Sequence, residues 1–298
     1  RTMPDTGQGV RQYWAQHGHR DGGWAATQYE TLIAGAAPTS ERHETTISIT
    51  VALSRTRRAV RAHGGGITGA AAVLRQEMAT LGAALHAAEL IVDGWVEPDD
   101  LAGILRLAYD PDAVHQLERA PRVGRDLQTA GPTLVTEELD HLRTDSGYHC
   151  VYWISEWPRS EVRPGFLESL LLAPGVRRAF TLVAQPLTTG EALRSLRRER
   201  VEYQADATQR ARIGQITDYA TEQEWADVNQ RERDLVAGHG ELRYAGFLCV
   251  TAPTLEGLQQ AKATIEQAAV NASCETRLLL GQQAQAFAAA ALPLGRGI

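Results

Sequence analysis

The second half of the chain alternates strand-like and helix-like segments in an order that few folds share. Apolar alternation or continuous apolar character predicts strands at 148–154, 178–185, 244–251 and 277–280. A short helix is expected after the first strand, two long helices after the second and one helix after the third. This is the order of a split βαβ, ferredoxin-like unit with a helical hairpin inserted between its middle strands. The predicted fold class is therefore α+β, with antiparallel sheets and helices on one face.

The first half is less regular, although residues 45–53 alternate between apolar and small polar side chains and predict a half-buried strand. The stretch 110–146 has the weakest pattern and is rich in proline and glycine, so we place a division there. The expected parts are an α+β subdomain at 1–125 and a ferredoxin-like subdomain at 126–298. The inserted helical hairpin is expected at about 187–240.

Charge and cysteine content narrow the class of protein. The 298 residues carry 30 basic and 36 acidic side chains, a net charge of −6, which argues against a general nucleic-acid binder. Cys150, Cys249 and Cys274 lie in apolar, strand-like surroundings without paired spacing, so we expect buried thiols rather than disulfides.

The chain offers no membrane span of its own. Its apolar runs are shorter than the roughly 18–20 residues that cross a bilayer. The opening residues, Arg1 to Pro4, resemble neither a natural start nor a signal peptide. We therefore expect an excised piece of a longer protein, whose membrane anchor lies outside this sequence.

Motifs of nucleotide-dependent motors and of nucleophilic catalysis are absent from the sequence. A P-loop requires glycines before a lysine, and Lys262, the only lysine, lies in a helical segment without them. His149 and Cys150 are neighbours in a predicted strand, so their side chains point to opposite faces and cannot form a dyad. The expectation is a protein without catalytic residues or a cofactor.

One short run near the start resembles part of a metal-binding motif. His17, His19 and Asp21 have the spacing of His-x-His-x-Asp, but no buried strand precedes them and Gly22 stands where a further histidine would follow. A metal-dependent hydrolase built on these residues is one hypothesis. A solvated loop without metal is the favoured interpretation.

Arginines crowd the first helix of the expected hairpin, which Thr188 and Glu191 open with the spacing of a capping box. Acidic residues are interspersed, so one interpretation is an exposed helix with internal ion pairs. The other is a protruding hairpin that docks on an acidic partner or on nucleic acid. The candidate partner-binding residues are Arg194, Arg197, Arg198, Arg200, Arg210 and Arg212.

Three C-terminal runs carry a family resemblance: Phe247 to Leu258, Cys274 to Gln283 and Ala291 to Gly295. Together they resemble the end of the N-terminal, non-motor domain of the conjugative-transfer, or type IV secretion, ATPases. The segments Trp24 to Tyr29 and His43 to Leu53 resemble the opening of the same domain.

The segment Gly64 to Met78 resembles a branch found in high-GC Gram-positive bacteria, in which the domain belongs to a membrane protein without a downstream motor. The resemblance implies a non-catalytic scaffold or docking domain on the cytoplasmic side of the cell membrane. Its implied partners are other secretion or conjugation subunits, including a motor ATPase. The alternative is a domain that contacts nucleic acid through the arginine-rich hairpin.

Overall fold

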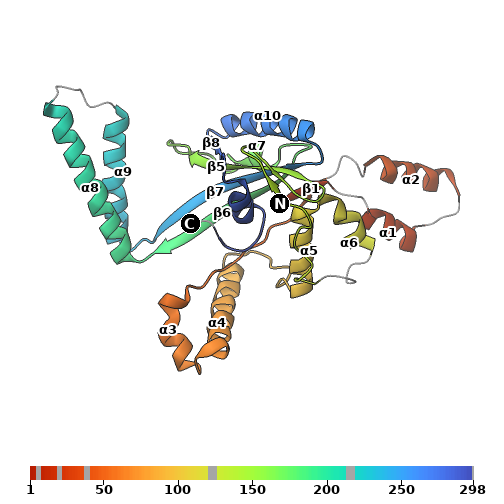
Figure 1. Cartoon of the computed structure of the whole chain (residues 1–298), viewed down its shortest axis with the longest axis horizontal. Coiled ribbons are helices and arrows are strands. Elements are labelled where there is room, and N and C mark those ends of the chain that lie inside the picture. Colours follow the sequence, from red (N-terminus) through yellow and green to blue (C-terminus); the bar gives the residue numbers. More distant parts are fainter. Residues whose placement is uncertain (5–7, 19–21, 37–40, 120–125, 213–218, 297–298) are drawn as a thin grey trace. The chain divides into compact units, whose positions relative to one another are not determined.

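The computed structural model describes residues 1–4, 8–18, 22–36, 41–119, 126–212, 219–296 and shows an α+β fold (Figure 1). The strands are β1 (Thr2–Pro4), β2 (Glu41–His43), β3 (Thr136–Glu137), β4 (Leu142–Arg143), β5 (Tyr148–Glu156), β6 (Arg177–Leu187), β7 (Glu241–Ala252) and β8 (Glu275–Leu278). The α-helices are α1 (Gln8–His17), α2 (Trp24–Ala36), α3 (Leu53–Ala62), α4 (Gly66–Ala87), α5 (Pro98–Tyr109), α6 (Val114–Arg119), α7 (Glu168–Leu171), α8 (Thr189–Arg212), α9 (Tyr219–Val236), α10 (Leu255–Asn271) and α11 (Gln283–Ala290). A 3₁₀ turn, η2 (Pro111–Ala113), joins α5 to α6.

Four strands form the centre of one antiparallel sheet in the order β8-β5-β7-β6. β5 pairs with β7 from Tyr148 opposite Ala252 to Ile154 opposite Gly246, and with β8 on its other side. Along the chain these strands come as β5, β6, β7 and β8, with α7, the α8–α9 pair and α10 between them. The predicted split βαβ unit with an inserted helical hairpin is confirmed.

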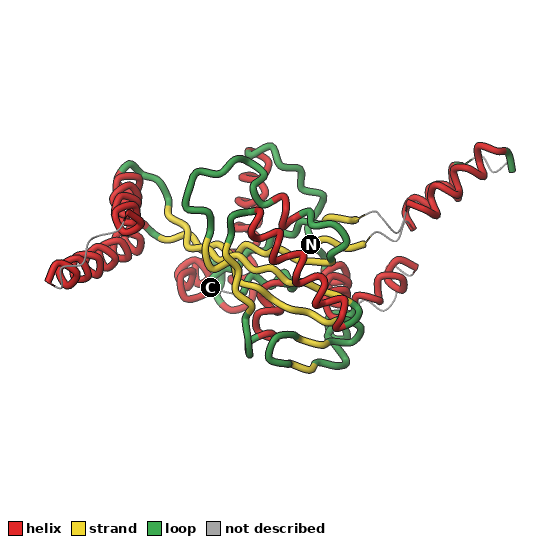
Figure 2. Tube along the Cα trace, turned by 90° about the horizontal axis from the view of Figure 1, so that it is seen from above, coloured by secondary structure: helices red, strands yellow, loops and turns green. Residues whose placement is uncertain are grey.

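One face of this sheet is covered by the two helices of the split βαβ unit. Cys150, Tyr152 and Ile154 point from β5 into a cluster with Leu258 and Ile265 of α10. All five are nearly inaccessible to solvent, and α7 supplies Leu170 to the same cluster. Figure 2 shows the strands side by side with a helix laid across them. Burial of this apolar surface is the main force that holds α10 on the sheet.

The opposite face carries a second cluster. Val151 of β5 and Cys249 of β7 pack there with Leu142, Phe287 and Ala290, the last two from α11. Side chains alternate between the two clusters along β5, because successive residues of a strand point to opposite faces. The prediction that His149 and Cys150 face apart is confirmed: the His149 ring lies 4.7 Å from that of Phe287, whereas Cys150 lies in the first cluster.

Short strands extend the sheet beyond this centre. β1 and β2 follow β6, and β4 and β3 follow β5, which gives the order β2-β1-β6-β7-β5-β4-β3 with β8 also paired to β5. Each of these four added strands is two or three residues long.

Contacts divide the chain into two compact units. One comprises Arg1–Thr181 with Gly246–Gly297, and the other is Leu182–Ala245, which contains α8 and α9. The second unit has its own small core, in which Ala192 and Leu196 of α8 meet Val228 and Leu235 of α9. The division predicted near residue 125 falls at residues outside the described part of the chain, and it stays a prediction.

The predicted strand at 45–53 is wrong. Residues 44–52 form no strand and pair with none of the described strands, and α3 begins at Leu53. The hydroxyl groups of Ser48 and Thr50 instead donate to the carbonyl oxygens of Pro293 and Gly295, at 2.7 and 3.2 Å. The alternation is real, but its neighbour is an irregular C-terminal segment that offers no regular ladder.

Candidate functional site

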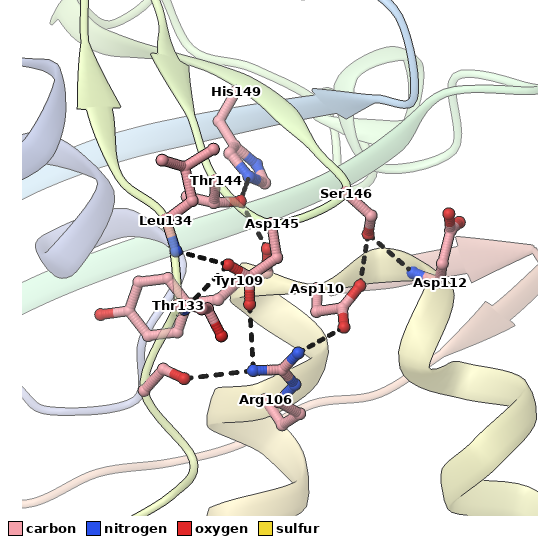
Figure 3. A network of polar contacts seen from close by, with 11 residues as sticks. Arg106, Tyr109, Asp110, Asp112, Thr133, Leu134, Thr144, Asp145, Ser146 and His149 are labelled. Atoms are coloured by element: carbon pink, nitrogen blue, oxygen red, sulfur yellow. Dashed lines mark hydrogen bonds and ion pairs between the residues drawn. The ribbon is translucent and has the colours of Figure 1, made fainter.

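A network of polar side chains joins the end of α5 to the turn between β4 and β5 (Figure 3). The helix begins with Pro98 in its first turn and places Arg106 in its last turn. The Arg106 guanidinium lies 2.6 Å from a carboxylate oxygen of Asp110 and 3.0 Å from one of Asp145. It also donates to the Gly131 carbonyl oxygen at 3.2 Å.

The two carboxylates extend the network to the backbone. Asp145 accepts the backbone N–H groups of Thr133 and Leu134 at 2.8 and 2.7 Å. Ser146 donates to Asp110 and accepts the backbone N–H of Asp112 at 3.1 Å. The Arg106–Asp110 pair is local to the end of α5, but the contacts of Asp145 and Ser146 join segments far apart in the sequence and stabilise backbone that no ladder supports.

His149 continues the network into the sheet. Its Nε2 lies 2.7 Å from the hydroxyl of Thr144, and its Nδ1 lies 2.9 Å from that of Thr251. The Thr144 hydroxyl donates its only proton to the Tyr109 carbonyl oxygen, so it must accept from His149 Nε2–H. Nδ1 is then the acceptor for Thr251. Burial, with a smaller contribution from Arg177, lowers the pKa of His149 to about 3. A neutral imidazole ring with both nitrogens hydrogen-bonded has a structural role and is a poor acid or base at neutral pH.

The cysteines also lack the features of nucleophiles. All three are free and buried, which confirms the predicted buried thiols. Burial raises the pKa of Cys249 to about 12 and that of Cys150 further still. The reactive form of cysteine is the thiolate, which these surroundings disfavour.

The predicted arginines all lie on α8 but have different surroundings. Arg200 lies 2.6 Å from Glu232 of α9, and its guanidinium lies 5.6 Å from the ring centre of Trp225. Arg194, Arg197 and Arg198 are exposed, and within the described residues none forms an ion pair. Arg210 and Arg212 are in the last turn of α8, and their side chains lie outside the described part.

Both interpretations of the arginine-rich helix therefore keep some support. Arg200 belongs to an internal pair that holds α8 on α9, like the pair between Arg231 and Glu199 at 2.6 Å. Arg194, Arg197 and Arg198 remain available for a partner, and their role in partner binding stays a prediction.

The candidate metal residues are only partly described. His17 ends α1 and stacks on Tyr13, with ring centres 4.6 Å apart. His19 and Asp21 lie outside the described residues. In the remainder of the chain, the residues that the structure places include no group of three or more potential metal ligands.

Sequence reasoning overlooked a second basic helix. The ten residues of α3 include Arg55, Arg57, Arg58 and Arg61, and none of its residues is buried. The signal was present in the sequence, because residues 45–76 contain five arginines and no aspartate or glutamate.

Among the helices that the structure describes, none is long and apolar enough to cross a membrane.

Comparison with known protein families gives a match over part of the chain. The model of a family described as "Putative type VII ESX secretion system translocon, EccE" matches residues 39–154. The matched segment runs from β2 through most of β5 and includes α3, α4 and the polar network. No curated protein matches the chain significantly.

The match supports the broad expectation and corrects the narrow one. Part of this chain is similar to a component of a bacterial secretion system, as the sequence implied. The expected kinship with the non-motor domain of type IV secretion ATPases is not supported, because the matching family is of type VII.

Proposed function

We propose that this chain is a non-catalytic docking domain of a membrane-associated type VII secretion apparatus. The observation that carries the proposal is the family match over 39–154, a segment that holds most of β5, one of the two inner strands of the split βαβ unit, and the network around Arg106. Docking requires a rigid body and exposed contact surfaces rather than reactive groups. The domain acts on the cytoplasmic side of the cell membrane, and its partners are other subunits of the apparatus, including its motor ATPase.

The chemistry of the described side chains supports a role without catalysis. His149 is locked in a neutral, hydrogen-bonded state, and the thiols of Cys150 and Cys249 are held protonated by burial. An enzyme site needs titratable groups in a cleft with pKa values near the working pH. The pKa values of His149, Cys150 and Cys249 are instead shifted away from neutral pH by burial.

The test is cross-linking of the full-length protein in membranes of its native host, followed by affinity purification and mass spectrometry. Recovery of secretion subunits supports the proposal and maps the docking face. Recovery of the protein alone, free of membranes, contradicts it.

Arg194, Arg197 and Arg198 supply the variant that makes this test specific. The triple change of these residues to Gln should reduce recovery of the partner that docks on α8 at least about tenfold, because rim charges steer association. Arg233→Gln is the matched control, since Arg233 is exposed on α9 and bonds to Gln230 at 2.7 Å. Equal recovery with the triple variant would remove α8 from the docking surface.

A second candidate function is contact with nucleic acid through the same three arginines, which are exposed and lie within about one turn and a half of helix. It predicts binding of a DNA duplex at low salt that weakens steeply as salt rises. Absence of binding at about 0.05 M salt, where screening is weak, would exclude it.

A further inference from the structure

The α3–α4 hairpin, which comprises Leu53 to Ala87, concentrates positive charge in an acidic chain. Residues 45–76 hold Arg55, Arg57, Arg58, Arg61 and Arg75 without one carboxylate, whereas the whole chain has a net charge of −6. Helices α3 and α4 lie side by side as two arms of a hairpin (Figure 1). A local charge of this size creates a strong positive potential over the hairpin.

Packing directs the arginines outward. A Cβ atom at Gly69 would lie 2.2 Å from the Val60 carbonyl oxygen, so the two helices touch through their backbones. Thr56 and Val60 are half-buried on the side that faces α4, and Arg57 and Arg58 are exposed. With about 3.6 residues per turn, Arg57, Arg58 and Arg61 share the other side of α3.

Within the described part of the chain, no carboxylate compensates the charge on this side of α3. No ion pair of Arg57, Arg58 or Arg61 exists among the residues described. Arg57 and Arg61 are four residues apart, and Arg58 and Arg61 three apart, so these like charges repel one another. α3 has no buried residue and no side-chain cap, so its packing on α4 has to offset this repulsion. An anionic partner would relieve the repulsion.

The tip of the hairpin adds apolar surface to this charge. Three glycines, Gly64 to Gly66, all with positive φ, make the tight turn between the helices. Ile67 follows directly and is 89% exposed, and Leu53 at the start of α3 is 60% exposed. Exposed apolar side chains in the same short hairpin as exposed arginines are a feature of helices that lie at a membrane surface.

We propose that the α3–α4 hairpin binds the surface of an anionic phospholipid bilayer, with its arginines on the headgroup phosphates and Ile67 at the acyl boundary. Guanidinium groups match phosphate oxygens in geometry as well as charge. Bare nucleic acid would satisfy the arginines but leave Ile67 in water, whereas a bilayer offers phosphates and an acyl boundary together. The inference rests on the proposed function for its setting, a membrane-associated apparatus.

The test is flotation of the purified 298-residue chain with lipid vesicles. Vesicles of phosphatidylcholine alone are compared with vesicles that contain about one third phosphatidylglycerol, whose surface is negative. We expect binding to the anionic vesicles only, and its loss as salt rises from about 0.05 to about 0.5 M. Equal binding to both compositions, or none to the anionic one at low salt, would overturn the proposal.

Two matched pairs of variants locate the contact. Changing Arg57, Arg58 and Arg61 to Gln should weaken partitioning about 100-fold, at roughly fivefold for each arginine. The same change in charge at Arg194, Arg197 and Arg198 should weaken partitioning less than about twofold, because those residues are on α8 and not on the α3–α4 hairpin. An equal loss in both triple variants would show a general effect of charge and refute the assignment.

The second pair separates lipid from other anions. Ile67→Ser should weaken partitioning about tenfold, because the apolar contact is lost. Ile91→Ser is the control, since Ile91 is 92% exposed but lies beyond the other end of α4, about 30 Å along the helix. Circular dichroism of each variant checks that the fold is kept. Partitioning unchanged by Ile67→Ser would overturn the lipid contact.

The outcomes also separate this inference from the proposed function. Flotation that depends on the hairpin, without cross-links to secretion subunits, would leave the lipid contact and remove the docking role. Cross-links that the α3 triple variant loses, with flotation like that of the unchanged chain, would assign the hairpin to an acidic protein and overturn the lipid contact.

Discussion

His149 shows how one side chain can organise a junction without taking part in chemistry. Its ring lies between the hydroxyl groups of Thr144 and Thr251 and packs on Phe287. The proton on Nε2 is fixed by Thr144, which is already committed to the Tyr109 carbonyl oxygen. The residue therefore connects β4, β5, β7 and the end of α5 only in its neutral form.

This neutrality predicts a pH dependence of stability. Burial lowers the folded-state pKa to about 3, whereas the unfolded value is 6.5. The unfolded chain thus takes up the proton first, and the stability that His149 provides is complete above pH 6.5 and falls as the pH drops toward 3. Between pH 7.5 and 5 this loss is about 2 kcal/mol.

Urea unfolding of the unchanged chain and of His149→Gln measures this pH-dependent loss of stability. The difference in unfolding free energy between the two should shrink by about 2 kcal/mol between pH 7.5 and 5, because only the unchanged chain has this group. A difference that stays constant over this range would show that His149 titrates normally in the folded state.

Gly147 gives a second prediction at the scale of the residue. A Cβ atom there would lie 2.8 Å from two atoms of the His149 ring and 3.0 Å from Pro111. Gly147→Ala should therefore lower the free energy of unfolding by about 1–3 kcal/mol through overpacking. Gly131→Ala is the control, because no atom lies within 4 Å of a Cβ at that position. Thermal unfolding compares the two, and equal midpoints would contradict the prediction.

The sequence did not predict which side chains pair with one another. The arginines of α8 could be assigned to one helix from their spacing, but Arg200 is distinguished from Arg198 by Glu232 and Trp225 on another helix. The network around Arg106 depends likewise on Asp145, which belongs to a turn 39 positions along the chain. Contacts of this kind follow from the tertiary fold and leave no local pattern.

At the scale of elements, local signals succeeded where the structure satisfies them locally. The predicted capping box is confirmed: Thr188 accepts the Glu191 backbone N–H at 3.3 Å, and the Glu191 carboxylate accepts the Thr188 backbone N–H at 3.0 Å. The strand at 45–53 failed for the opposite reason. Its alternation needed a partner strand, and the neighbouring segment is irregular.

The capping box can be tested by itself. Thr188→Ala removes one of its two reciprocal bonds and should destabilise the start of α8 by about 1 kcal/mol. Hydrogen exchange of the amides in the first turn of α8 should then be about fivefold faster. Thr208→Ala is the matched control, since Thr208 lies within the same helix and, among the described residues, donates to the Gln204 carbonyl oxygen and to no other group. Equal exchange in both variants would show that the box does not stabilise the helix.

At the scale of the molecule, the order of elements predicted the centre of the sheet but not its margins. The succession of β5, β6, β7 and β8 with their helices has one common solution, and the chain adopts it. β1 to β4 are too short for a period of two to be visible. β1 pairs with β6 and β4 with β5, and β2 and β3 pair in turn with β1 and β4, as unpaired backbone groups at a sheet edge favour.

The same architecture predicts that the α8–α9 hairpin can be removed. β6 and β7 are neighbours in the sheet, so a two-residue Asn-Gly turn can join Leu187 to Glu241 in place of 188–240. Neither of the two clusters around β5 contains a residue of the deleted segment. We expect the shortened chain to unfold cooperatively, with hydrogen exchange in β5 unchanged.

We expect binding to anionic vesicles and cross-linking to the partner of α8 to reside on different hairpins. The shortened chain retains the α3–α4 hairpin and should float with anionic vesicles like the complete chain, because none of the deleted residues lies on that hairpin. It should lose the cross-links that depend on Arg194, Arg197 and Arg198. The triple Gln variant of these residues keeps the α8–α9 hairpin. It therefore shows whether the cross-links are lost through the missing charge or through the missing helices. Cross-links that survive the deletion would place the docking surface on the remaining unit, and a chain that no longer folds would show that the inserted hairpin is part of its core.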